Sequence, residues 1–373
     1  MSNNGPVPFI QLEPTTGKLV ICQEGIDVLT EKNQQRQPLC IIACAGLYRT
    51  GKSFLLNCIV NSLLSATTSE TSASTTKTTS KSTRFPVGST SEACTRGIWI
   101  WDPDITVRGK KIILMDSEGL ASLDQDEQHD AQIFCLALLL SSFFILNTQG
   151  VIDENAIDRL YLVGEISKKI CVASSSSAAS STTTTTKTTS SISNNQEKEL
   201  SEYFPPFMWL LRDFHLDLEH QGRTLSTNEY LEQSLADRST TITGKKKGRN
   251  RRTEERNDTR RSIRQLFRNR QCFTMVRPCL EEDVLRKANK LNDNELRPKF
   301  LSQLNDLVDI LKQAPIKNVM GTHVDGVQLV QLASNYTDAI NSGAMPEIKG
   351  AWESVVENTY KMQTVIAFHI TKI

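Results

Sequence analysis

Apolar and polar positions follow two patterns along the chain. Short apolar runs that end in glycine or polar residues are typical of buried strands, and apolar residues three or four positions apart are typical of helices. The runs predict strands over Leu39–Ala45, Ile98–Trp101, Lys111–Asp116, Phe143–Asn147, Phe207–Leu211 and Cys272–Val276. The helical period predicts helices over Ser53–Leu64, Ala131–Ser142, Asn155–Ile170 and Arg261–Arg268, and a short helix after the capping box Ser226–Glu229. This alternation predicts an α/β fold, a mainly parallel sheet with helices on both faces.

The pattern changes after Pro278, where strand-like runs stop and only the helical period remains. Further helices are predicted over Glu295–Gln313, Val327–Asn341 and Ile348–His369. We therefore expect a large α/β domain over residues 1–280 and a short all-helical region over residues 281–373.

Two segments differ from the rest in composition. Residues 65–83 contain 14 Ser or Thr in 19 positions, and residues 173–193 contain 16 in 21. Such segments bury too little apolar surface to offset the entropy lost on ordering. We expect both to be disordered insertions in loops of the α/β domain.

Charge and cysteine usage narrow the class of protein. The net charge of the 373 residues is +1, which indicates no particular partner. The nine cysteines form neither CxxC pairs nor zinc-like spacings with histidine, which favours reduced thiols in a cytoplasmic protein. The longest apolar run, Ile133–Leu146, is too short to span a bilayer, and no cysteine at the C-terminus suits prenylation. We expect neither a transmembrane segment nor a lipid anchor.

The segment GLYRTGKS, from Gly46 to Ser53, matches the phosphate-loop pattern G-x-x-x-x-G-K-[ST]. Its position between a predicted strand and a predicted helix favours this interpretation over a glycine-rich turn without a ligand. Lys52 is expected to reach the β- and γ-phosphates, and the Ser53 hydroxyl to ligate Mg²⁺. The predicted nucleotide contacts of this segment are Gly46, Tyr48, Arg49, Thr50, Gly51, Lys52, Ser53 and Phe54.

Two further segments supply candidate partners for the phosphate loop. Asp116 ends a predicted strand and is expected to hold Mg²⁺ through water, and Gly119 is expected to offer its N–H to the γ-phosphate. Thr95 precedes the strand at Ile98, where nucleotide switches supply a hydroxyl to Mg²⁺. A plain surface threonine is the alternative for Thr95.

The predicted strand Phe207–Leu211 ends in Arg212 and Asp213, and the usual guanine-reading sequence Asn-Lys-x-Asp is absent. A carboxylate accepts hydrogen bonds from N1–H and the 2-amino group of guanine, whereas adenine offers an acceptor at N1. Ligands bind at the carboxyl ends of such strands, so Asp213 is a candidate base reader. A solvated Arg–Asp pair on a loop is the alternative, and spacing alone does not exclude it.

In these motifs the chain resembles the guanylate-binding protein family, which comprises dynamin-related large GTPases and includes the atlastins. The matching segments are GLYRTGKSFLLN, TRGIWIW, LMDSEGL, LALLLSSFFILNTQG to IDRLYLV, FMWLLRDFHLDLE and CFTMVRP. They occur in family order from about Pro8 to Pro278, and a fainter likeness continues through GVQLVQLASNYTDAINSGAMPEI.

The resemblance implies a P-loop GTPase sheet, GTP as substrate and Mg²⁺ as cofactor. It implies that Arg212 and Asp213 contact the base, with Asp213 as the guanine reader. It also implies that Arg49 acts as an arginine finger in cis, and that Thr95 and Glu118 organise the attacking water. GTP-bound domains of the family pair face to face, so a transient homodimer is expected.

The chain departs from the family pattern at two places. Many members carry a serine two residues before the switch threonine, and this chain has Ala93. The family's long helical tail is cut short here, so membrane work of the atlastin type is not expected. Ala93 keeps a second interpretation open, a GTP-regulated scaffold with little or no hydrolysis.

A basic run, Lys245–Arg270, carries 12 basic and 3 acidic residues. The favoured interpretation is a solvated, flexible insertion over the base pocket, and the alternative is a nuclear-import or nucleic-acid patch. Phe267 is the only aromatic residue in the run, so we expect no nucleic-acid partner.

Overall fold

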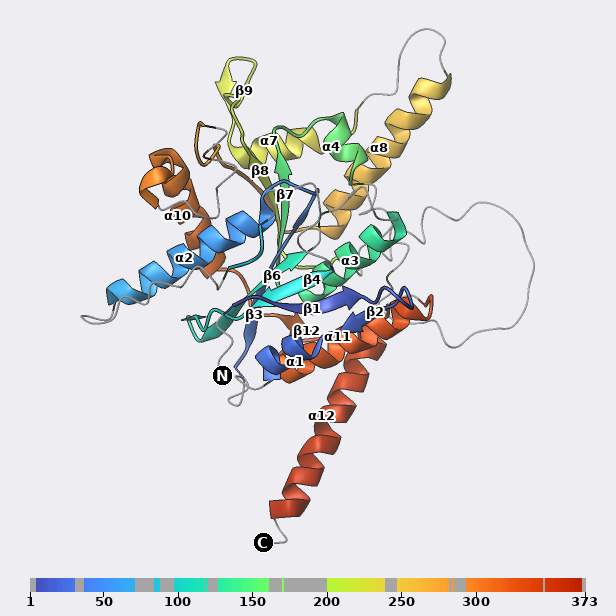
Figure 1. Cartoon of the computed structure of the whole chain (residues 1–373). Coiled ribbons are helices and arrows are strands. Elements are labelled where there is room, and N and C mark those ends of the chain that lie inside the picture. The colour runs from blue at the N-terminus through green and yellow to red at the C-terminus, as the bar shows by residue number, and fades with distance from the viewer. Residues whose placement is uncertain are drawn as a thin grey trace.

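A nine-stranded mixed sheet forms the centre of the computed structural model (Figure 1). Its strand order is β11-β8-β7-β3-β6-β4-β1-β2, and β5 pairs with β6 beside this path. Strands β11, β8, β7, β3 and β6 run parallel, which confirms the predicted α/β class. The bounds of the parallel strands are Leu39–Gly46 (β3), Lys110–Ser117 (β6), Phe143–Gln149 (β7), Phe207–Arg212 (β8) and Arg270–Thr274 (β11). The remaining strands of the sheet are Val7–Leu12 (β1), Leu19–Ile21 (β2), Ile98–Trp101 (β4) and Thr106–Val107 (β5).

The structure describes residues 5–30, 37–70, 84–87, 97–117, 119, 127–160, 170, 200–238, 247–281, 284, 293–344 and 346–370. The second Ser/Thr-rich segment, 173–193, lies outside these residues. The first begins inside a helix, because α2 continues to Glu70, and its remainder, 71–83, lies outside the described residues.

The central strand β3 is apolar along its whole length because both faces of the sheet are covered. All eight residues of β3 are buried. Ile41 and Ala43 belong to one apolar core, and Cys40 and Ile42 belong to the core on the opposite face. A continuous apolar run therefore folds here as a strand shared by two cores.

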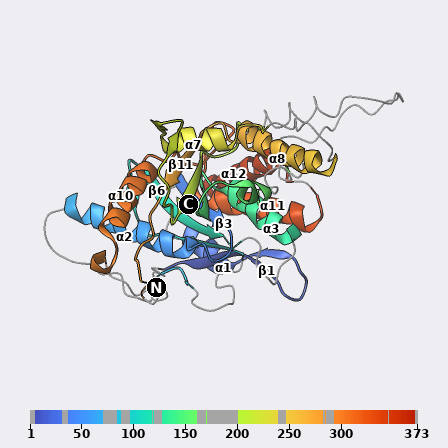
Figure 2. The ribbon, with the colours of Figure 1, turned by 90° about the horizontal axis from the view of Figure 1, so that it is seen from above.

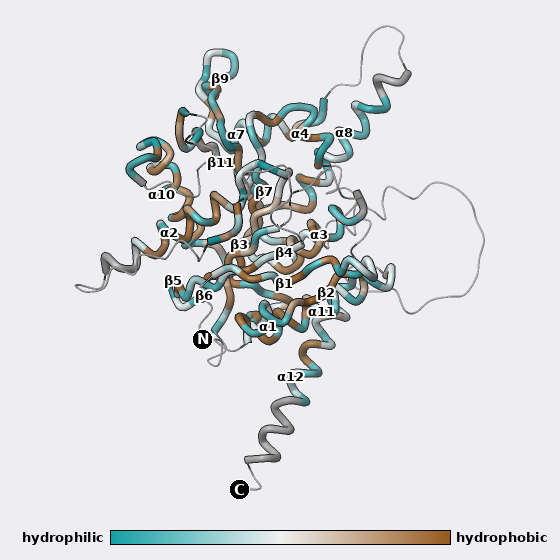
Figure 3. The backbone as a smooth tube through the Cα atoms, viewed as in Figure 1, coloured by the Kyte–Doolittle hydropathy of each residue, from teal (hydrophilic) through white to brown (hydrophobic). Residues whose placement is uncertain are grey.

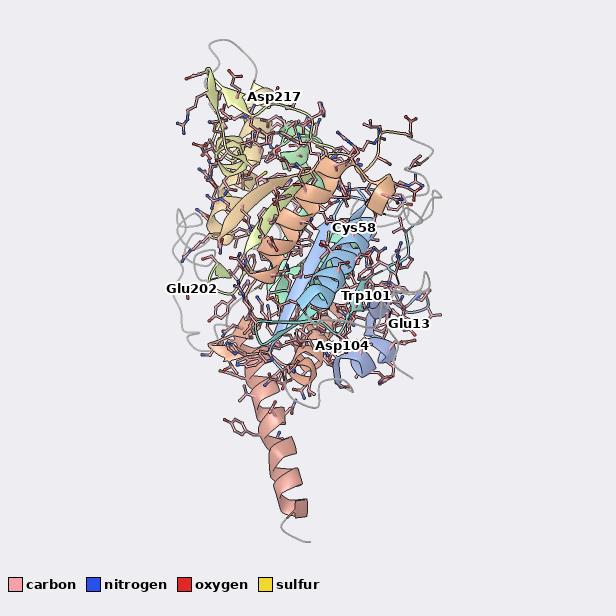
Figure 4. The ribbon with its side chains drawn as sticks, turned by 90° about the vertical axis from the view of Figure 1, so that its left-hand side faces the viewer. Glu13, Cys58, Trp101, Asp104, Glu202 and Asp217 are labelled. Carbon is pink, nitrogen blue, oxygen red and sulfur yellow. The ribbon has the colours of Figure 1, made fainter. Side chains whose placement is uncertain are left out.

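Helices cover both faces of the sheet, as predicted (Figure 2). One face packs against α2 (Lys52–Glu70) and α10 (Pro298–Lys312), which lie side by side in Figure 4. The opposite face packs against α3 (Glu127–Leu140) and α11 (Gly326–Asn341), with α1 (Gln23–Thr30) beside α11. In Figure 3 hydrophobic positions concentrate where these helices meet the sheet.

The segment after residue 280 is part of this packing. Both cores contain its side chains, for example Phe300 on one face and Leu329 on the other. Two backbone hydrogen bonds also join it to the first residue of β3: Lys317 N–H donates to Leu39 O (2.7 Å) and Leu39 N–H donates to Val324 O (3.2 Å). The expected division at residue 280 therefore does not coincide with a break in packing.

Some elements differ from the sequence prediction. The absence of strands after Pro278 was a wrong expectation, because the short strands β12 (Asn318–Val319) and β13 (Thr322–His323) pair as a hairpin. Helix α4 (Glu154–Asp158) is described over only part of the predicted helix, and residues 161–169 lie outside the described residues. The capping box at Ser226 is confirmed at the start of α7 (Thr227–Ser234).

Two more minor elements belong to the described structure. They are the hairpin of β9 (Glu219–His220) with β10 (Arg223–Thr224), and the 3₁₀ turn Asp293–Glu295.

The last helix, α12 (Ile348–Ile370), leaves the body of the molecule in Figure 1. Its first turns are anchored by the buried side chains of Ile348, Trp352 and Val355, which join the core beneath α11. Among the helices of the described residues, none has the length and apolar composition needed to cross a membrane.

Candidate nucleotide-binding site

The carboxyl ends of the five parallel strands meet at one edge of the sheet. Strand register places Cys44 opposite Asp116 and Gly46 opposite Asn147. The loops that follow these strands are therefore neighbours, as expected for a ligand site of an open α/β sheet.

The phosphate loop connects β3 to α2 through unusual backbone angles. Gly46 has φ 151° and Gly51 has φ 76°, both in the region that favours glycine. A Cβ atom on Gly46 would lie 2.1 Å from the carbonyl oxygen of Asn147, so no side chain fits there. Arg49 has φ 62°, a left-handed conformation that is rare for a residue with a side chain.

Side-chain hydrogen bonds to carbonyl oxygens stabilise the conformation of this loop. The buried Lys52 ammonium donates to the carbonyl oxygens of Leu47 (3.1 Å) and Gly46 (3.3 Å). The Thr50 hydroxyl also donates to Leu47 O (2.8 Å). From the neighbouring strand, the Asn147 side-chain amide donates to Thr50 O (2.9 Å). Asn147 was not among the site residues predicted from the sequence. Its position directly after the apolar run Phe143–Leu146 could have indicated a site residue.

Ser53 and Asp116 come together beneath the loop. The Ser53 hydroxyl donates to Asp116 Oδ2 at 2.5 Å, and Asp116 is fully buried at the end of β6. Hydroxyl and carboxylate oxygens are the ligands that Mg²⁺ takes in nucleotide sites, so this pair fits the expected ion. The nearby Cys44 thiol has its pKa raised to about 12, first by burial and then by the charge of Asp116.

The second loop packs directly on the first. A Cβ atom on Gly119 would lie 2.5 Å from the Cα of Tyr48, so only glycine permits this approach. Arg49 is exposed, and its guanidinium carbon lies 5.3 Å from the centre of the Tyr48 ring. The predicted site residues Thr95 and Glu118, together with Ala93, lie outside the described residues.

Arg212 lies below the phosphate loop rather than at its surface. Its residue is 4% exposed, and a guanidinium nitrogen lies 3.5 Å from Gly51 O. The guanidinium carbon is 5.8 Å from the ring centre of Phe300, which stacks at 6.3 Å on Phe54. Burial lowers the pKa of this guanidinium from its usual value. Arg212 therefore connects the loop to α10, a contact that the sequence did not indicate.

Asp213 lines a cavity of about 660 Å³ beside the loop. The residue is half-buried with φ 56°, and its carboxylate makes no hydrogen bond or ion pair with any residue that the structure describes. The cavity is also lined by the segment after β11 and by the start of α10: Thr274, Met275, Val276, Arg277, Arg297, Lys299 and Gln303.

Most of the basic run forms a helix, α8 (Lys247–Leu266), rather than the flexible insertion that we expected. Its arginines lie against acidic side chains: Arg256 contacts Asp158 at 2.5 Å, and Arg260 contacts Glu154 at 2.7 Å. The end of this helix lies within the predicted helix Arg261–Arg268, whereas its first half was not predicted because it is polar on all sides. These ion pairs account for the basic composition by contacts within the chain.

A sequence model described as "Guanylate-binding protein, N-terminal domain" matches residues 16–319. The chain belongs to the guanylate-binding protein family. It is 33% identical to guanylate-binding protein 2 of Rattus norvegicus and 34% identical to guanylate-binding protein 1 of Homo sapiens, over 97% of this chain and 55% of each relative. Guanylate-binding protein 6 of Mus musculus is 33% identical over 95% of this chain and 52% of its own. The chain spans about half the length of these curated relatives.

The extent of the guanylate-binding protein match agrees with the packing. It continues past residue 280 through α10 to Val319, in the hairpin that is joined to β3. The family resemblance predicted from the motifs is confirmed.

Proposed function

We propose that this guanylate-binding protein family member binds GTP together with Mg²⁺ and hydrolyses it to GDP. The observation that carries the proposal is the Ser53–Asp116 contact of 2.5 Å beneath a loop that also holds the buried Lys52. A hydroxyl, a carboxylate and an ammonium at one helix start suit a metal-bound polyphosphate. The family membership supports the same substrate.

Each part of the loop has a distinct role in the proposal. The backbone N–H groups from Tyr48 to Phe54 bind the phosphate oxygens, and Lys52 adds a positive charge at the β- and γ-phosphates. Ser53 and Asp116 hold Mg²⁺, with Thr95 as a further ligand. When bound, the ion offsets phosphate charge and orients the γ-phosphate. Glu118 and Thr95 position the attacking water, and Gly119 donates its N–H to the γ-phosphate.

Arg49 is proposed as an arginine finger in cis. Its exposed side chain starts from within the backbone segment that is proposed to bind the phosphates. A guanidinium at the β- and γ-phosphates stabilises the charge that develops during transfer. In the proposal, pairing of two GTP-bound domains brings the arginine into place, so the homodimer forms transiently with nucleotide.

Asp213 is proposed to select guanine, with Arg212 supporting the phosphate loop from below. The Asp213 carboxylate lines the cavity and has no partner among the residues that the structure describes, which supports this assignment. A cytoplasmic location, expected from the cysteine usage, stays a prediction.

Ala93 favours a second candidate, a GTP-regulated scaffold that binds nucleotide and hardly hydrolyses it. The two candidates share the site and differ in turnover. Phosphate release by the purified chain with GTP and Mg²⁺ separates them, because only the GTPase releases phosphate over many cycles.

The proposal is tested by measuring affinity and turnover with GTP, GDP and ATP. We expect tight binding of both guanine nucleotides, weak binding of ATP and phosphate release from GTP. The variant Lys52→Ala is expected to lose tight binding, whereas Lys312→Ala, which removes a lysine on the outside of α10, is expected to keep it. Equal affinity for ATP and GTP, or unchanged affinity in Lys52→Ala, would contradict the proposal.

A further inference from the structure

An arginine that follows the neighbouring strand lines the cavity at Asp213. Strands β8 and β11 run parallel with Leu211 opposite Thr274, so their carboxyl ends lie together. Met275 N–H donates to Leu211 O (2.8 Å) and Phe214 N–H donates to Met275 O (3.0 Å), which fixes the two segments side by side. Asp213 follows β8 and Arg277 follows β11, and both line the cavity.

Neither charged group has a partner within the described part of the chain. The Nε atom of Arg277 is buried and makes no hydrogen bond there, and its guanidinium is in no ion pair. Asp213 is in the same situation, whereas the α8 arginines Arg256 and Arg260 are paired with carboxylates. A buried donor without an acceptor is unfavourable, so an acceptor on a ligand would stabilise this site.

Both charges also act on one buried thiol in the segment that follows Arg277. The nearby thiol of Cys279 has its pKa raised first by burial, while the charge of Arg277 lowers it and that of Asp213 raises it. Arg277 and Asp213 are thus both close to one side chain, although they form no ion pair with each other.

Guanine presents complementary groups on two adjacent edges. One edge carries the donors N1–H and the 2-amino group, and the other carries the acceptors O6 and N7. A carboxylate suits the first edge, and an arginine fork donating to O6 and N7 is the commonest specific contact to guanine. Adenine has an amino group where guanine has O6, which opposes the arginine, and an acceptor at N1, which opposes the carboxylate.

We propose that Arg277 is a specificity-determining residue that donates to O6 and N7 of the guanine base held by Asp213. This inference rests on the proposed function, because it names a second reader in the same base site. Helix α10 positions the arginine: Arg297 donates from its guanidinium to Arg277 O (3.3 Å) and from its backbone to Pro278 O (2.8 Å). The Gln303 side chain accepts from Val276 N–H (2.8 Å).

The test compares three diphosphates, so that hydrolysis does not interfere: GDP, inosine diphosphate, which lacks the 2-amino group, and 7-deazaguanosine diphosphate, which lacks N7 and keeps N1–H and the 2-amino group. We expect wild type to bind each analogue roughly ten- to a hundredfold more weakly than GDP. Arg277→Met should lose the preference for GDP over the 7-deaza nucleotide and keep its preference over inosine diphosphate. Arg277→Lys should retain part of the first preference, because lysine can still donate to N7.

A matched control is Lys299→Met, which removes another cation of the same cavity. It should leave both preferences unchanged, with melting curves confirming that each variant is folded. If Arg277→Met discriminates against the 7-deaza nucleotide as wild type does, the assignment of Arg277 is overturned. Arg277→Lys gives the same test if Arg277→Met does not fold. If wild type discriminates only against inosine diphosphate, the assignment of Arg277 is also overturned, while that of Asp213 is kept. Equal binding of all three nucleotides by wild type would overturn the guanine site itself.

Discussion

At the residue scale, backbone strain marks the two ends of the candidate site. Among the residues that the structure describes, six other than glycine have positive φ: Arg49, Asp104, Arg108, Asp213, Gln221 and Met320. Arg108, Gln221 and Met320 lie in the tight turns of hairpins, where this conformation reverses the chain. Arg49 and Asp213 lie in longer loops after β3 and β8. Strain at such positions is typical of residues held for a function.

The Asp213→Asn variant tests base selection. The amide would donate to the 2-carbonyl of xanthine but repel the 2-amino group of guanine. We expect GTP affinity to fall roughly ten- to a hundredfold and xanthosine triphosphate affinity to rise. Competition binding measures both. Asp217→Asn, a second carboxylate of the same cavity (labelled in Figure 4), should leave the preference for GTP intact. A persistent GTP preference in Asp213→Asn means that the base is read by other groups.

The sequence predicted only some of the site residues, for a physical reason. Lys52, Ser53 and Asp116 are recognisable because the loop geometry demands those residue types at fixed spacing. Asn147 and Arg277 are not, because their roles depend on which strands are neighbours in the sheet. Strand order is a property of the folded chain and leaves no local pattern.

At the element scale, α10 belongs to the nucleotide site although it lies beyond the expected domain boundary. Phe300 is fully buried, stacks on Phe54 of α2 and lies 5.8 Å from the Arg212 guanidinium. The ring face attracts the buried cation, which is itself within 3.5 Å of Gly51 O. The position of α10 thereby influences the phosphate loop.

Phe300→Leu keeps an apolar side chain and removes the ring face. We expect nucleotide affinity to fall several-fold, because Arg212 loses an attraction of about 1–2 kcal/mol. The control Leu304→Ala removes a buried side chain from the same helix and core, and should lower stability by about 2–5 kcal/mol while affinity stays near wild type. Calorimetric titration with GDP and urea unfolding measure the two effects. Unchanged affinity in Phe300→Leu would show that α10 only supports the fold.

Lys317 links the hairpin region to the end of α3. Its buried ammonium donates to Leu139 O (2.6 Å) and Ser141 O (2.8 Å), and burial lowers its pKa to about 7. The unfolded chain keeps the proton up to a pH of about 10.4. Between these values the unfolded state binds more protons, so stability rises with pH by at most about 1.4 kcal/mol per unit.

Lys317→Met should remove this rise. Urea unfolding at pH 7 and at pH 9 gives the free energy of unfolding for both proteins. We expect the gain between the two pH values to be larger in wild type, by up to about 3 kcal/mol. Other groups titrate equally in both proteins and cancel in the comparison. Parallel pH profiles would mean that Lys317 stays charged in the folded state.

Element prediction succeeded where a single pattern dominates. The parallel strands are continuous apolar runs, so their existence was evident from the sequence. β1, β2 and α1 were missed because their runs are short and half-exposed. The part of α8 before Arg261 was missed because ion pairs rather than an apolar stripe hold it. Tertiary contacts override local pattern in these segments.

At the scale of the whole molecule, the sheet and the segment after residue 280 form one packing unit. The sheet would lose buried side chains on both faces without α10 and α11. These include Phe300, Leu304, Leu307, Leu311, Leu329, Leu332 and Tyr336. Burial of one such side chain contributes about 1.5–3 kcal/mol, and total stabilities are about 5–15 kcal/mol.

Two truncations test this unity. A chain of residues 1–280 should fail to unfold cooperatively. The burial free energy that it loses with α10 and α11 exceeds the usual free energy of unfolding of a domain. A chain of residues 1–344 keeps both helices and should melt cooperatively, at a lower temperature than the full chain because the α12 anchors are lost. Circular dichroism melting compares them. If residues 1–280 melt cooperatively near the melting temperature of the full chain, the domain boundary expected at residue 280 is supported.

In the proposed mechanism, the phosphate loop hydrolyses GTP with Arg49 as its own arginine finger. The most direct test is single-turnover phosphate release from GTP at saturating protein, with wild type, Arg49→Ala and the control Arg108→Ala. Arg108 is another arginine with positive φ (52°), in the turn between β5 and β6. We predict phosphate release by wild type and Arg108→Ala, and a rate roughly 10³-fold lower in Arg49→Ala with GTP affinity only modestly changed. Release by Arg49→Ala at more than about a third of the wild-type rate, or no release by wild type, would contradict the account.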